Sequence, residues 1–327
     1  MHEESLDIDL PFRRALVTGG AGFVGHGVVA ALRSAGAEVV VLDPGRPHPL
    51  WPAGVHHLKG DVRDLSTVRR AAAGCGMIFH VAGLWDGGPG GAERMESINV
   101  GGTRAVLSVG LPVVYTSSSI TCGFGSRAQP GTEDEPSEDP RHPIQGTGAR
   151  YRQTKLAAER LVTEAGGHIV NPDYVIGPGD VNGVVTGPLL AAARLPIILA
   201  PRGGKCFVGV DDVGLGHLLV LRGLPGRRYL LGSENLSYGE IFGRVAAALG
   251  RQPRILPLPR AIPRLLRRLP RIGQTAGAAE QMGLERYRSH ARAARELGFS
   301  PAPIDAALQE MVSAVQLDEG REALSEI

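Results

Sequence analysis

With 327 residues, the chain is long enough for one large core domain and a smaller lobe beside it. A net charge of +2, with 43% hydrophobic and 21% charged residues, is that of an ordinary globular protein and argues against nucleic acid as a partner. Three widely separated cysteines predict no metal site and fit a reducing cytoplasm. The N-terminus lacks the apolar part of a signal peptide, and no apolar stretch approaches the roughly 18 residues that cross a bilayer.

Short apolar runs alternate with helix-compatible segments through the first half of the chain. The expected strands are nearly all apolar rather than alternating, which indicates burial on both faces, as in a parallel sheet covered by helices. The sequence therefore predicts an α/β, doubly wound core domain. In chain order, the expected strands are 15–20, 38–43, 56–62, 77–83, 112–119 and 168–172, and the expected helices are 27–36, 64–74, 99–110 and 151–166.

At about residue 178 the alternation breaks into segments that are interrupted by proline. One further strand-like run, "CFVGVDDV" at 206–213, is expected to return to the sheet. We therefore assign residues 11–176 and 205–232 to the core domain, and residues 177–204 and 233–327 to a smaller C-terminal lobe.

A glycine-rich turn joins the first expected strand to the first helix. In "LVTGGAGFVG" the glycines Gly19, Gly22 and Gly25 are spaced G-x-x-G-x-x-G. Glycine lets the backbone turn tightly and approach a pyrophosphate, whose charge is met by amides at the helix N-terminus, here near Phe23 and Val24. The strand before and the helix after supply the context that a lone glycine triplet lacks, so this turn predicts a dinucleotide site.

An acidic residue, Asp43, ends the next strand at about the 20-residue interval expected for a ribose contact. Its carboxylate would accept hydrogen bonds from the adenosine ribose and repel a 2′-phosphate, which favours NAD over NADP. Arg46 lies three residues further on and could instead attract a 2′-phosphate, so NADP stays an alternative.

An ordered set of motifs extends from about residue 13 to residue 305. They are "TGGAGFVG", "GDVRD" at 60–64, "HVAG" at 80–83, "INVGGT" around Asn99, "YTSSS" at 115–119, "YRQTK" at 151–155 and "GPGD" at 177–180. In this combination the sequence resembles the extended short-chain dehydrogenases/reductases, the superfamily of NAD-dependent epimerases and dehydratases. The resemblance implies that the core is a Rossmann domain that binds NAD and that the smaller lobe binds the substrate. It also implies cofactor contacts from Asp61, Val62, Ala82, Gly83, Asn99, Tyr151, Lys155 and Pro172.

The resemblance implies that Asn99 supports the side of the site that contains Lys155 through a water molecule. A helix cap is the alternative role for Asn99, because "SINVGGT" could begin a helix.

Tyr151 and Lys155 stand about one helical turn apart, so in a helix both side chains leave the same face. This spacing also suits a surface helix without a chemical task, but the resemblance implies that the two residues are the catalytic pair. A phenol with a pKa of about 10 is a weak base at neutral pH. A positive charge about 4 Å away favours the phenolate by up to about 4 kcal/mol, so Lys155 is expected to bring Tyr151 near neutrality.

A third group should hydrogen-bond the reacting oxygen, and Ser117, Ser118 and Ser119 follow the expected strand "PVVYT". Similarity to the "TSS" pattern of the family points to Ser118 as the third catalytic residue. Ser119 would face the substrate or fill space, and Ser117 would hydrogen-bond its own backbone.

Other positions bear on the class of substrate. Dehydratases of the family carry Asp-Glu after the active-site hydroxyl, whereas this sequence has Ser119 and Ile120, so dehydration is not expected. Epimerases usually place Asn before V-Y-G-P to hold a diphosphate, whereas Tyr174 stands there. The segment "NPDYVIGPGD" is more similar to 3β-hydroxysteroid dehydrogenase-like, dihydroflavonol reductase-like and hopanoid-associated reductase-like members, although Asn171 replaces an arginine.

We therefore expect an oxidoreductase that exchanges hydride between NAD and a secondary alcohol or ketone on a fairly apolar molecule. The expected substrate contacts are Leu84, Ser118, Ser119 and Tyr174. Two alternatives stay open: a nucleotide-sugar epimerase with tightly bound NAD, and a dinucleotide sensor without turnover, which the intact Tyr151 and Lys155 disfavour.

The resemblance also implies a homodimer that forms through the helices containing Asn99 and Tyr151. Residues 251–273 concentrate arginines around leucines and prolines, which suits a solvated surface better than a membrane-binding element, and their role stays unassigned. His217 lies among apolar residues and is expected to be packed and hydrogen-bonded rather than catalytic.

Overall fold

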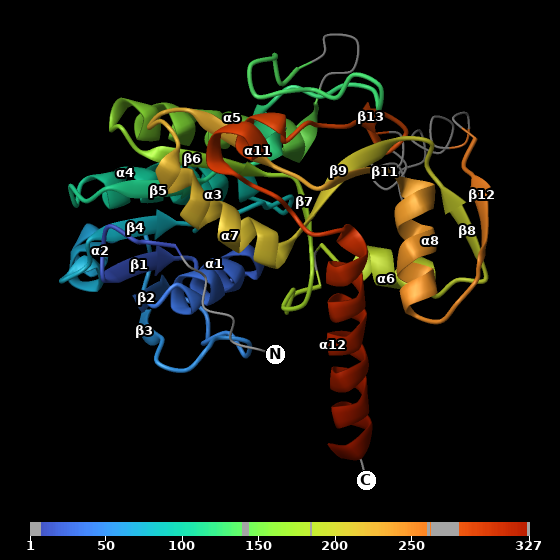
Figure 1. The fold of residues 1–327 in the computed structure, drawn as a ribbon, viewed down its shortest axis with the longest axis horizontal. Helices are drawn as coiled ribbons and strands as arrows, with labels where there is room; N and C mark the ends of the chain where they lie inside the picture. The colour runs from blue at the N-terminus through green and yellow to red at the C-terminus, as the bar shows by residue number, and fades with distance from the viewer. Residues whose placement is uncertain (1–7, 139–143, 184, 260–261, 263–280, 326–327) are drawn as a thin grey trace.

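A seven-stranded sheet forms the centre of the molecule (Figure 1). The computed structural model describes residues 8–138, 144–183, 185–259, 262 and 281–325. The strands of this sheet are β1 (Arg14–Thr18), β2 (Glu38–Asp43), β3 (His56–Lys59), β4 (Met77–His80), β5 (Val113–Thr116), β6 (His168–Pro172) and β10 (Arg228–Leu231). Their order is β10-β6-β5-β4-β1-β2-β3, and every neighbouring pair is parallel. The predicted doubly wound fold is confirmed.

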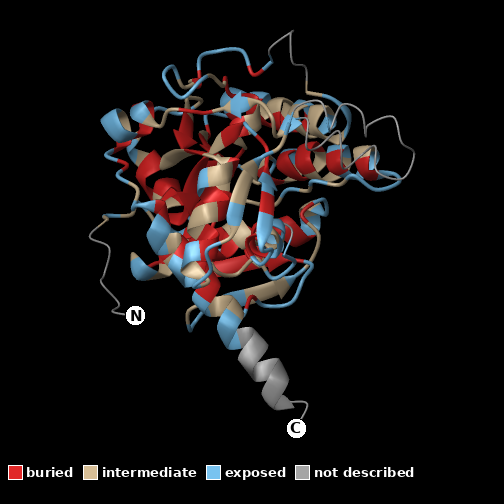
Figure 2. Cartoon of the chain, turned by 90° about the vertical axis from the view of Figure 1, so that its right-hand side faces the viewer, coloured by how far each residue is buried: buried red, intermediate tan, exposed pale blue. Residues whose placement is uncertain are grey.

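Helices cover both faces of this sheet, so successive residues of a strand enter different cores. Ala15 and Val17 pack with one layer of helices, whereas Leu16 between them packs with the other. The central strands are buried along nearly their whole length (Figure 2), and most of their residues are apolar. The first layer holds α1 (Phe23–Ser34), α7 (Val210–Leu219) and α11 (Ala291–Leu297), and the second holds α2 (Leu65–Ala72), α4 (Gly102–Leu107) and α5 (Gly146–Glu164).

Short helical segments link these elements. Helix α3 (Gly91–Met95) continues through the π-helical segment η1 (Glu96–Gly101) into α4, and the 3-10 turns η2 (Ser119–Thr121) and η3 (Val220–Arg222) follow β5 and α7. Because Thr18, His80 and Tyr115 are neighbours in register, the carboxyl ends of β1, β4 and β5 meet at one edge of the sheet. Doubly wound folds bind their ligands at such an edge.

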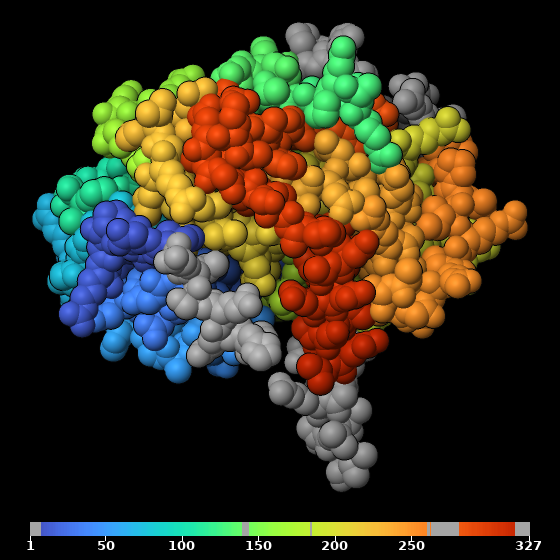
Figure 3. All heavy atoms as spheres, viewed as in Figure 1, coloured from blue at the N-terminus to red at the C-terminus, as the bar shows by residue number. Residues whose placement is uncertain are grey.

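A second core lies at the other end of the molecule from the N-terminal strands (Figure 3). It is built on β7 (Tyr174–Ile176), β9 (Gly204–Gly209), β11 (Glu234–Ser237) and β13 (Glu285–Arg286), and on the pair β8 (Ile197–Ala200) and β12 (Arg254–Pro257). Helices α6 (Gly187–Ala193), α8 (Tyr238–Ala248) and α12 (Ile304–Ser325) pack into the same core. The boundaries of the two predicted lobes stay a prediction.

The expectation that the run 206–213 returns to the seven-stranded sheet is wrong. Its strand, β9, pairs with β7, β11 and β13 in the smaller sheet, and α7 begins at Val210. The last strand of the main sheet is instead β10, which pairs with β6. A buried strand is apolar whether it lies in a small sheet or in a large one. The apolar composition of β9 therefore could not predict which strands it pairs with. Within the described residues, no helix combines the length and the apolar character needed to cross a membrane.

Candidate functional site

The glycine-rich turn after β1 leaves no space for side chains. Gly19 has a φ of +73°, and a Cβ on it would lie 2.6 Å from the backbone of Ala82. A Cβ on Gly25 would lie 2.0 Å from the carbonyl oxygen of Gly19. No side chain caps the start of α1, so the amides of its first turn are available to an anion. The turn therefore fits a pyrophosphate, and it contains the predicted residues Gly19, Gly22, Phe23, Val24 and Gly25.

Asp43 lies against this turn at the end of β2. The carboxylate is buried, and it accepts hydrogen bonds from the backbone amides of Ala21 at 3.1 Å and Gly45 at 2.7 Å. Each carboxylate oxygen has a second acceptor position, so the group can still accept a ribose hydroxyl. Arg46 lies in an exposed stretch of the same loop. This arrangement fits the adenosine end of NAD.

We predict that the protein binds NAD(H) at least about tenfold more tightly than NADP(H), and that Asp43→Asn narrows or inverts this preference. The physical reason is the repulsion between the carboxylate and a 2′-phosphate. Calorimetry with both cofactors measures the preference, and Asp9→Asn, which removes an exposed carboxylate elsewhere, is the control. Thermal melting shows whether the contacts to Ala21 and Gly45 survive. Equal or stronger NADP(H) binding by the unmodified protein would show that Arg46 outweighs Asp43.

The other residues predicted to contact the cofactor follow the same sheet edge. Asp61 comes after β3, and hydrogen bonds from Arg63 lower the pKa of its carboxyl group. Val62 is buried against α4, where a Cβ on Gly102 would lie 2.7 Å from Val62 Cγ1. Ala82 and Gly83 follow β4, and Pro172 ends β6. The structure thus brings these residues to one edge, and their contacts with NAD stay a prediction.

Asn99 lies inside the continuous helix formed by α3, η1 and α4, so the alternative of a helix cap is wrong. Its Oδ1 accepts a hydrogen bond from the amide of Leu84 at 2.7 Å, and its Nδ2 donates to the Leu84 carbonyl at 2.9 Å. Nδ2 also donates to Thr154 Oγ1 at 2.9 Å. Asn99 therefore ties the loop after β4 to α5, the helix that carries Tyr151.

The three predicted catalytic residues come together where β5 ends. Ser118 follows β5, whereas Tyr151 and Lys155 project from α5. The side chain of Ser118 lies near Tyr151 and lowers the pKa of its hydroxyl. The buried Lys155 donates from Nζ to the carbonyl oxygen of Thr116 at 2.9 Å, and Nζ lies 5.8 Å from the centroid of the Tyr151 ring. This cluster places two hydroxyls side by side with a cation behind them.

Burial is the main influence on the acidity of this cluster. Burial raises the pKa of Tyr151 to about 12, and its hydrogen bond with Ser118 acts in the opposite direction. Burial lowers the pKa of Lys155 to about 8, while the charge of Glu159 raises it. Lys155 donates to the Thr116 carbonyl, and burial is the larger influence on the pKa of Tyr151. That Lys155 brings Tyr151 near neutrality stays a prediction for the NAD-bound protein.

Comparison with known proteins identifies the family. Residues 15–232 match the model of the NAD dependent epimerase/dehydratase family. The chain belongs to this family. It is an NAD-dependent enzyme of the short-chain dehydrogenase/reductase type, which confirms the resemblance of its motifs.

Two curated relatives and one solved structure align with this family member over nearly the whole of both chains. A Synechocystis sp. protein named after dihydroflavonol 4-reductase is 30% identical, with 90% of this chain and 92% of that protein covered. A 3 beta-hydroxysteroid dehydrogenase/Delta 5-->4-isomerase of Mycobacterium tuberculosis is 29% identical, with 92% and 89% covered. The crystal structure of gox2253 is similar at 26% identity, with a TM-score of 0.76 over 94% of this chain and 98% of that one.

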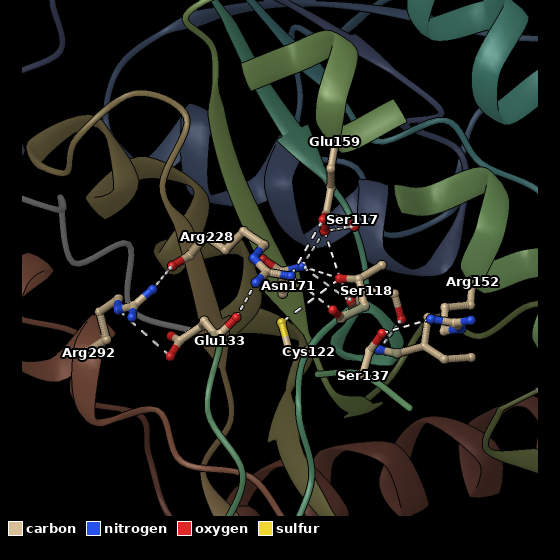
Figure 4. Close-up of polar contacts among 12 residues, drawn as sticks. Ser117, Ser118, Cys122, Glu133, Ser137, Arg152, Glu159, Asn171, Arg228 and Arg292 are labelled. Carbon is tan, nitrogen blue, oxygen red and sulfur yellow. Dashed lines mark hydrogen bonds and ion pairs between the residues drawn. The ribbon is translucent and has the colours of Figure 1, made fainter. Parts of the chain in front are cut away.

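In this family member a buried carboxylate, Glu159, supports the catalytic turn, and sequence reasoning missed it (Figure 4). Oε1 of Glu159 accepts hydrogen bonds from Ser117 Oγ at 2.5 Å, Thr121 Oγ1 at 2.7 Å and Asn171 Nδ2 at 2.7 Å. Asn171 also donates to the backbone carbonyl of Ser118 at 3.2 Å. The expectation that Ser117 hydrogen-bonds its own backbone is wrong, because its hydroxyl donates to this carboxylate. Glu159 therefore holds the turn that carries Ser118.

Arg228, on β10, supplies a positive charge beside this carboxylate (Figure 4). Its Nη1 lies 3.9 Å from Glu159 Oε2 and donates to the Thr121 carbonyl at 2.9 Å. Its Nη2 donates to the carbonyl of Glu133, whose buried carboxylate lies 3.8 Å from Arg292. Arg228 therefore links the carboxylate of Glu159 to the segment that contains Glu133.

The predicted substrate contacts lie on segments that border the catalytic cluster. Tyr174 is partly exposed, and its hydroxyl donates to the Val185 carbonyl at 2.8 Å. Leu84 is partly exposed and is held by Asn99. Ser118 is also partly exposed, whereas Ser119 is buried. The fixed Tyr174 hydroxyl leaves its ring as the surface for a ligand.

A pair of buried histidines, which no sequence pattern connects, holds the "GPGD" loop. The rings of His26 and His48 stack with centroids 4.3 Å apart and an angle of 8° between their planes. His26 Nε2 hydrogen-bonds the Pro178 carbonyl at 3.0 Å, and His48 Nε2 hydrogen-bonds the Gly179 carbonyl at 2.9 Å. Burial, followed by the charge of His48, lowers the pKa of His26 to about 4. The loop after β7 is therefore tied to α1 and to the segment after Asp43.

The expected packing of His217 is confirmed. Its ring is fully buried, with Nδ1 2.7 Å from the Val213 carbonyl and Nε2 2.6 Å from Thr116 Oγ1.

Proposed function

We propose that the protein interconverts a secondary alcohol and a ketone on a fairly apolar small molecule, with Tyr151 as acid and base. The observation that carries the proposal is that Ser118, Tyr151 and Lys155 gather where β5 ends, with Ser118 lowering the pKa of Tyr151 and Lys155 Nζ 5.8 Å from the centroid of the Tyr151 ring. Two hydroxyls that meet at the carboxyl edge of a doubly wound sheet can bind one carbonyl oxygen together. NAD, when bound, supplies or accepts the hydride.

The protein residues manage the proton and the developing charge. In the direction of reduction, the carbonyl oxygen accepts a hydrogen bond from Ser118 and takes the proton of Tyr151 as hydride reaches its carbon. The phenolate that remains is stabilised by the Lys155 ammonium and regains a proton from solvent. In the direction of oxidation, the phenolate takes the alcohol proton. The position of Glu159 keeps Ser118 in place during either reaction.

The proposed class of substrate follows from the polar side chains that the site offers to a ligand. Ser119 and Ile120 stand where dehydratases carry Asp-Glu, which argues against dehydration. Tyr174 stands where epimerases offer Asn, and its hydroxyl is bound by Val185. An apolar ligand needs no fixed donors for a diphosphate, and its burial contributes roughly 25 cal/mol per Å². The similarity to a steroid dehydrogenase supports the same class.

A nucleotide-sugar epimerase is the second candidate, and one observation favours it. Lys205 on β9 lies beside Arg286 in register, and its Nζ is 5.2 Å from the Tyr174 ring. These cations could hold a diphosphate. The neighbouring Arg288 does not add to them in the same way, because it pairs with the buried Asp173 at 2.8 Å.

A substrate panel tests the proposal. The protein is incubated with NADH and sterol-like, aryl and alkyl ketones, and separately with uridine- and thymidine-diphosphate sugars. We expect one NADH to be consumed for each ketone reduced. Sugar isomerisation without net cofactor consumption would contradict the proposal and favour the epimerase. Binding of NAD by calorimetry without turnover of any member of the panel would favour a sensor.

The homodimer and the cytoplasmic location stay proposals. Leu156, Ala157 and Leu161 on α5 are only partly buried, which leaves apolar surface for a second copy. The three cysteines are buried and form no disulfide, in agreement with a reducing compartment. A monomer in light scattering at micromolar concentration would contradict the dimer, and detection of the protein outside the cytoplasm would contradict the location.

A further inference from the structure

The parallel pair β8 and β12 lies at the end of the smaller lobe (Figure 1) and carries exposed apolar side chains. Leu195, Ile197 and Leu199 are 53%, 52% and 53% exposed. Ile198 between them is buried in the core of the lobe, so the strand alternates and turns one complete side outward. Three large apolar side chains exposed within five residues form a contiguous patch rather than scattered single contacts.

Arginines adjoin this patch. Register pairs Ile197 with Arg254 and Leu199 with Leu256, so these four side chains share the outward side of the two strands. Arg254 is exposed. Arg251 is exposed as well and donates to the carbonyl of Arg194 at 2.7 Å. We call Leu195, Ile197, Leu199, Arg251 and Arg254 the β8–β12 face.

The two segments that carry this face lack acidic residues, although Arg244 pairs with Glu234 at 2.9 Å and with Asp305 at 3.4 Å. Residues 181–210 contain no Asp or Glu but carry Arg194, Arg202 and Lys205, and residues 241–259 contain none but carry Arg244, Arg251 and Arg254. Because the whole chain has a net charge of only +2, the remaining sequence is net negative. The two segments that carry the apolar face are therefore basic, although acidic residues such as Glu234, Glu240 and Asp305 lie elsewhere in the same lobe. The acid-free run continues in the sequence to residue 279, although the face does not include those residues.

The sequence alone favours a solvated surface for residues 251–273, which include Arg251 and Arg254, but the exposed aliphatic side chains beside them change that interpretation. We propose that the β8–β12 face is a docking surface for an anionic lipid bilayer. The apolar side chains would enter the interface between headgroups and acyl chains, and the arginines would pair with anionic headgroups. A protein partner with an acidic surface would satisfy the arginines but has no need of three exposed aliphatic side chains in a row. The inference does not depend on the reaction proposed above, because it concerns a separate surface and its test measures binding alone.

Co-sedimentation of the full chain with vesicles tests the proposal. We expect binding to vesicles of phosphatidylcholine with about 30% phosphatidylglycerol, weaker binding at high salt, and little binding to phosphatidylcholine alone. Arg254→Glu should weaken binding about tenfold or more, because each basic residue near such a surface contributes about 1 kcal/mol and the change reverses its charge. Arg69→Glu is the matched control, since Arg69 is exposed on α2.

A second pair of variants tests the apolar part. Ile197→Ser/Leu199→Ser should also weaken binding about tenfold or more, whereas Leu224→Ser, at a site 61% exposed elsewhere, should not. Circular dichroism confirms that the variants fold. Equal binding to uncharged vesicles, or an equal loss in the control variants, would overturn the proposal. Light scattering without vesicles that shows self-association, lost in Ile197→Ser/Leu199→Ser, would overturn it in favour of an interface between copies of this chain.

Discussion

Tyr151→Phe is expected to lower turnover at least ~10²-fold while leaving NAD binding largely intact. The substitution removes the hydroxyl that Ser118 contacts but keeps the ring that packs near Lys155. The Ser118 hydroxyl cannot replace it, because a serine hydroxyl is a much weaker acid than a phenol. Initial rates with an active ketone and calorimetry with NAD(H) measure the two quantities separately.

The control for this variant is Tyr115→Phe, which makes the same chemical change next to the same lysine. Tyr115 lies under Lys155 Nζ at 4.9 Å from its ring centroid, and its buried hydroxyl has no hydrogen-bond partner in the part of the chain that the structure describes. Turnover should therefore survive the loss of this hydroxyl. Near-normal activity in Tyr151→Phe would refute the mechanism, and an equal loss in Tyr115→Phe would show that packing rather than proton transfer was disturbed.

The raised pKa of Tyr151 bears on the direction of reaction that this residue favours. The sequence indicated a lysine one turn away but not how deeply the phenol is buried, and burial is the larger effect here. With its pKa raised to about 12 by burial, the phenol of Tyr151 carries its proton at neutral pH, which suits the proposed protonation of a carbonyl. Oxidation of an alcohol requires the phenolate form of Tyr151. This form is populated only if nearby positive charges lower the pKa by more than burial raises it.

Patterns that are local in sequence predicted the fold well. The strand β1 and the helix α1 follow from an apolar run, a glycine turn and a helical segment within about 20 residues, and Asp43 follows from the length of that unit. The strand β9 shows the limit of this reasoning. Its apolar residues indicated a buried strand, but only the folded chain determines that it pairs with β7 rather than with the main sheet.

The supporting residues of the site could not be predicted because their partners are distant in sequence. Glu159 stands one turn after Lys155, which places it on the same helix face, but its contacts come from β6 and from the turn after β5. Arg228 comes from the last strand of the sheet, 69 positions after Glu159, and no local pattern connects the two. The stacked pair of His26 and His48 likewise depends on the loop after β7.

Gly25→Ala is expected to weaken NAD binding at least ~10²-fold, which is a loss of about 2.7 kcal/mol. The added Cβ would lie 2.0 Å from the carbonyl oxygen of Gly19 and 2.7 Å from the Cα of Gly20. Both contacts are with backbone atoms, so no side-chain rotation can relieve them. The turn between β1 and α1 must move, and with it the first-turn amides that would face the pyrophosphate.

Gly187→Ala is the matched control, because among the described residues no atom lies within 4 Å of the position that the added methyl group would take at the start of α6. This variant should keep its affinity for NAD and its melting temperature, or gain slightly in stability. Calorimetry gives the affinities, and melting curves with and without NAD show whether Gly25→Ala still folds and whether the cofactor still stabilises it. Affinity for NAD equal to that of the unmodified protein would mean that the turn can absorb a methyl group, and the pyrophosphate would then have to bind elsewhere.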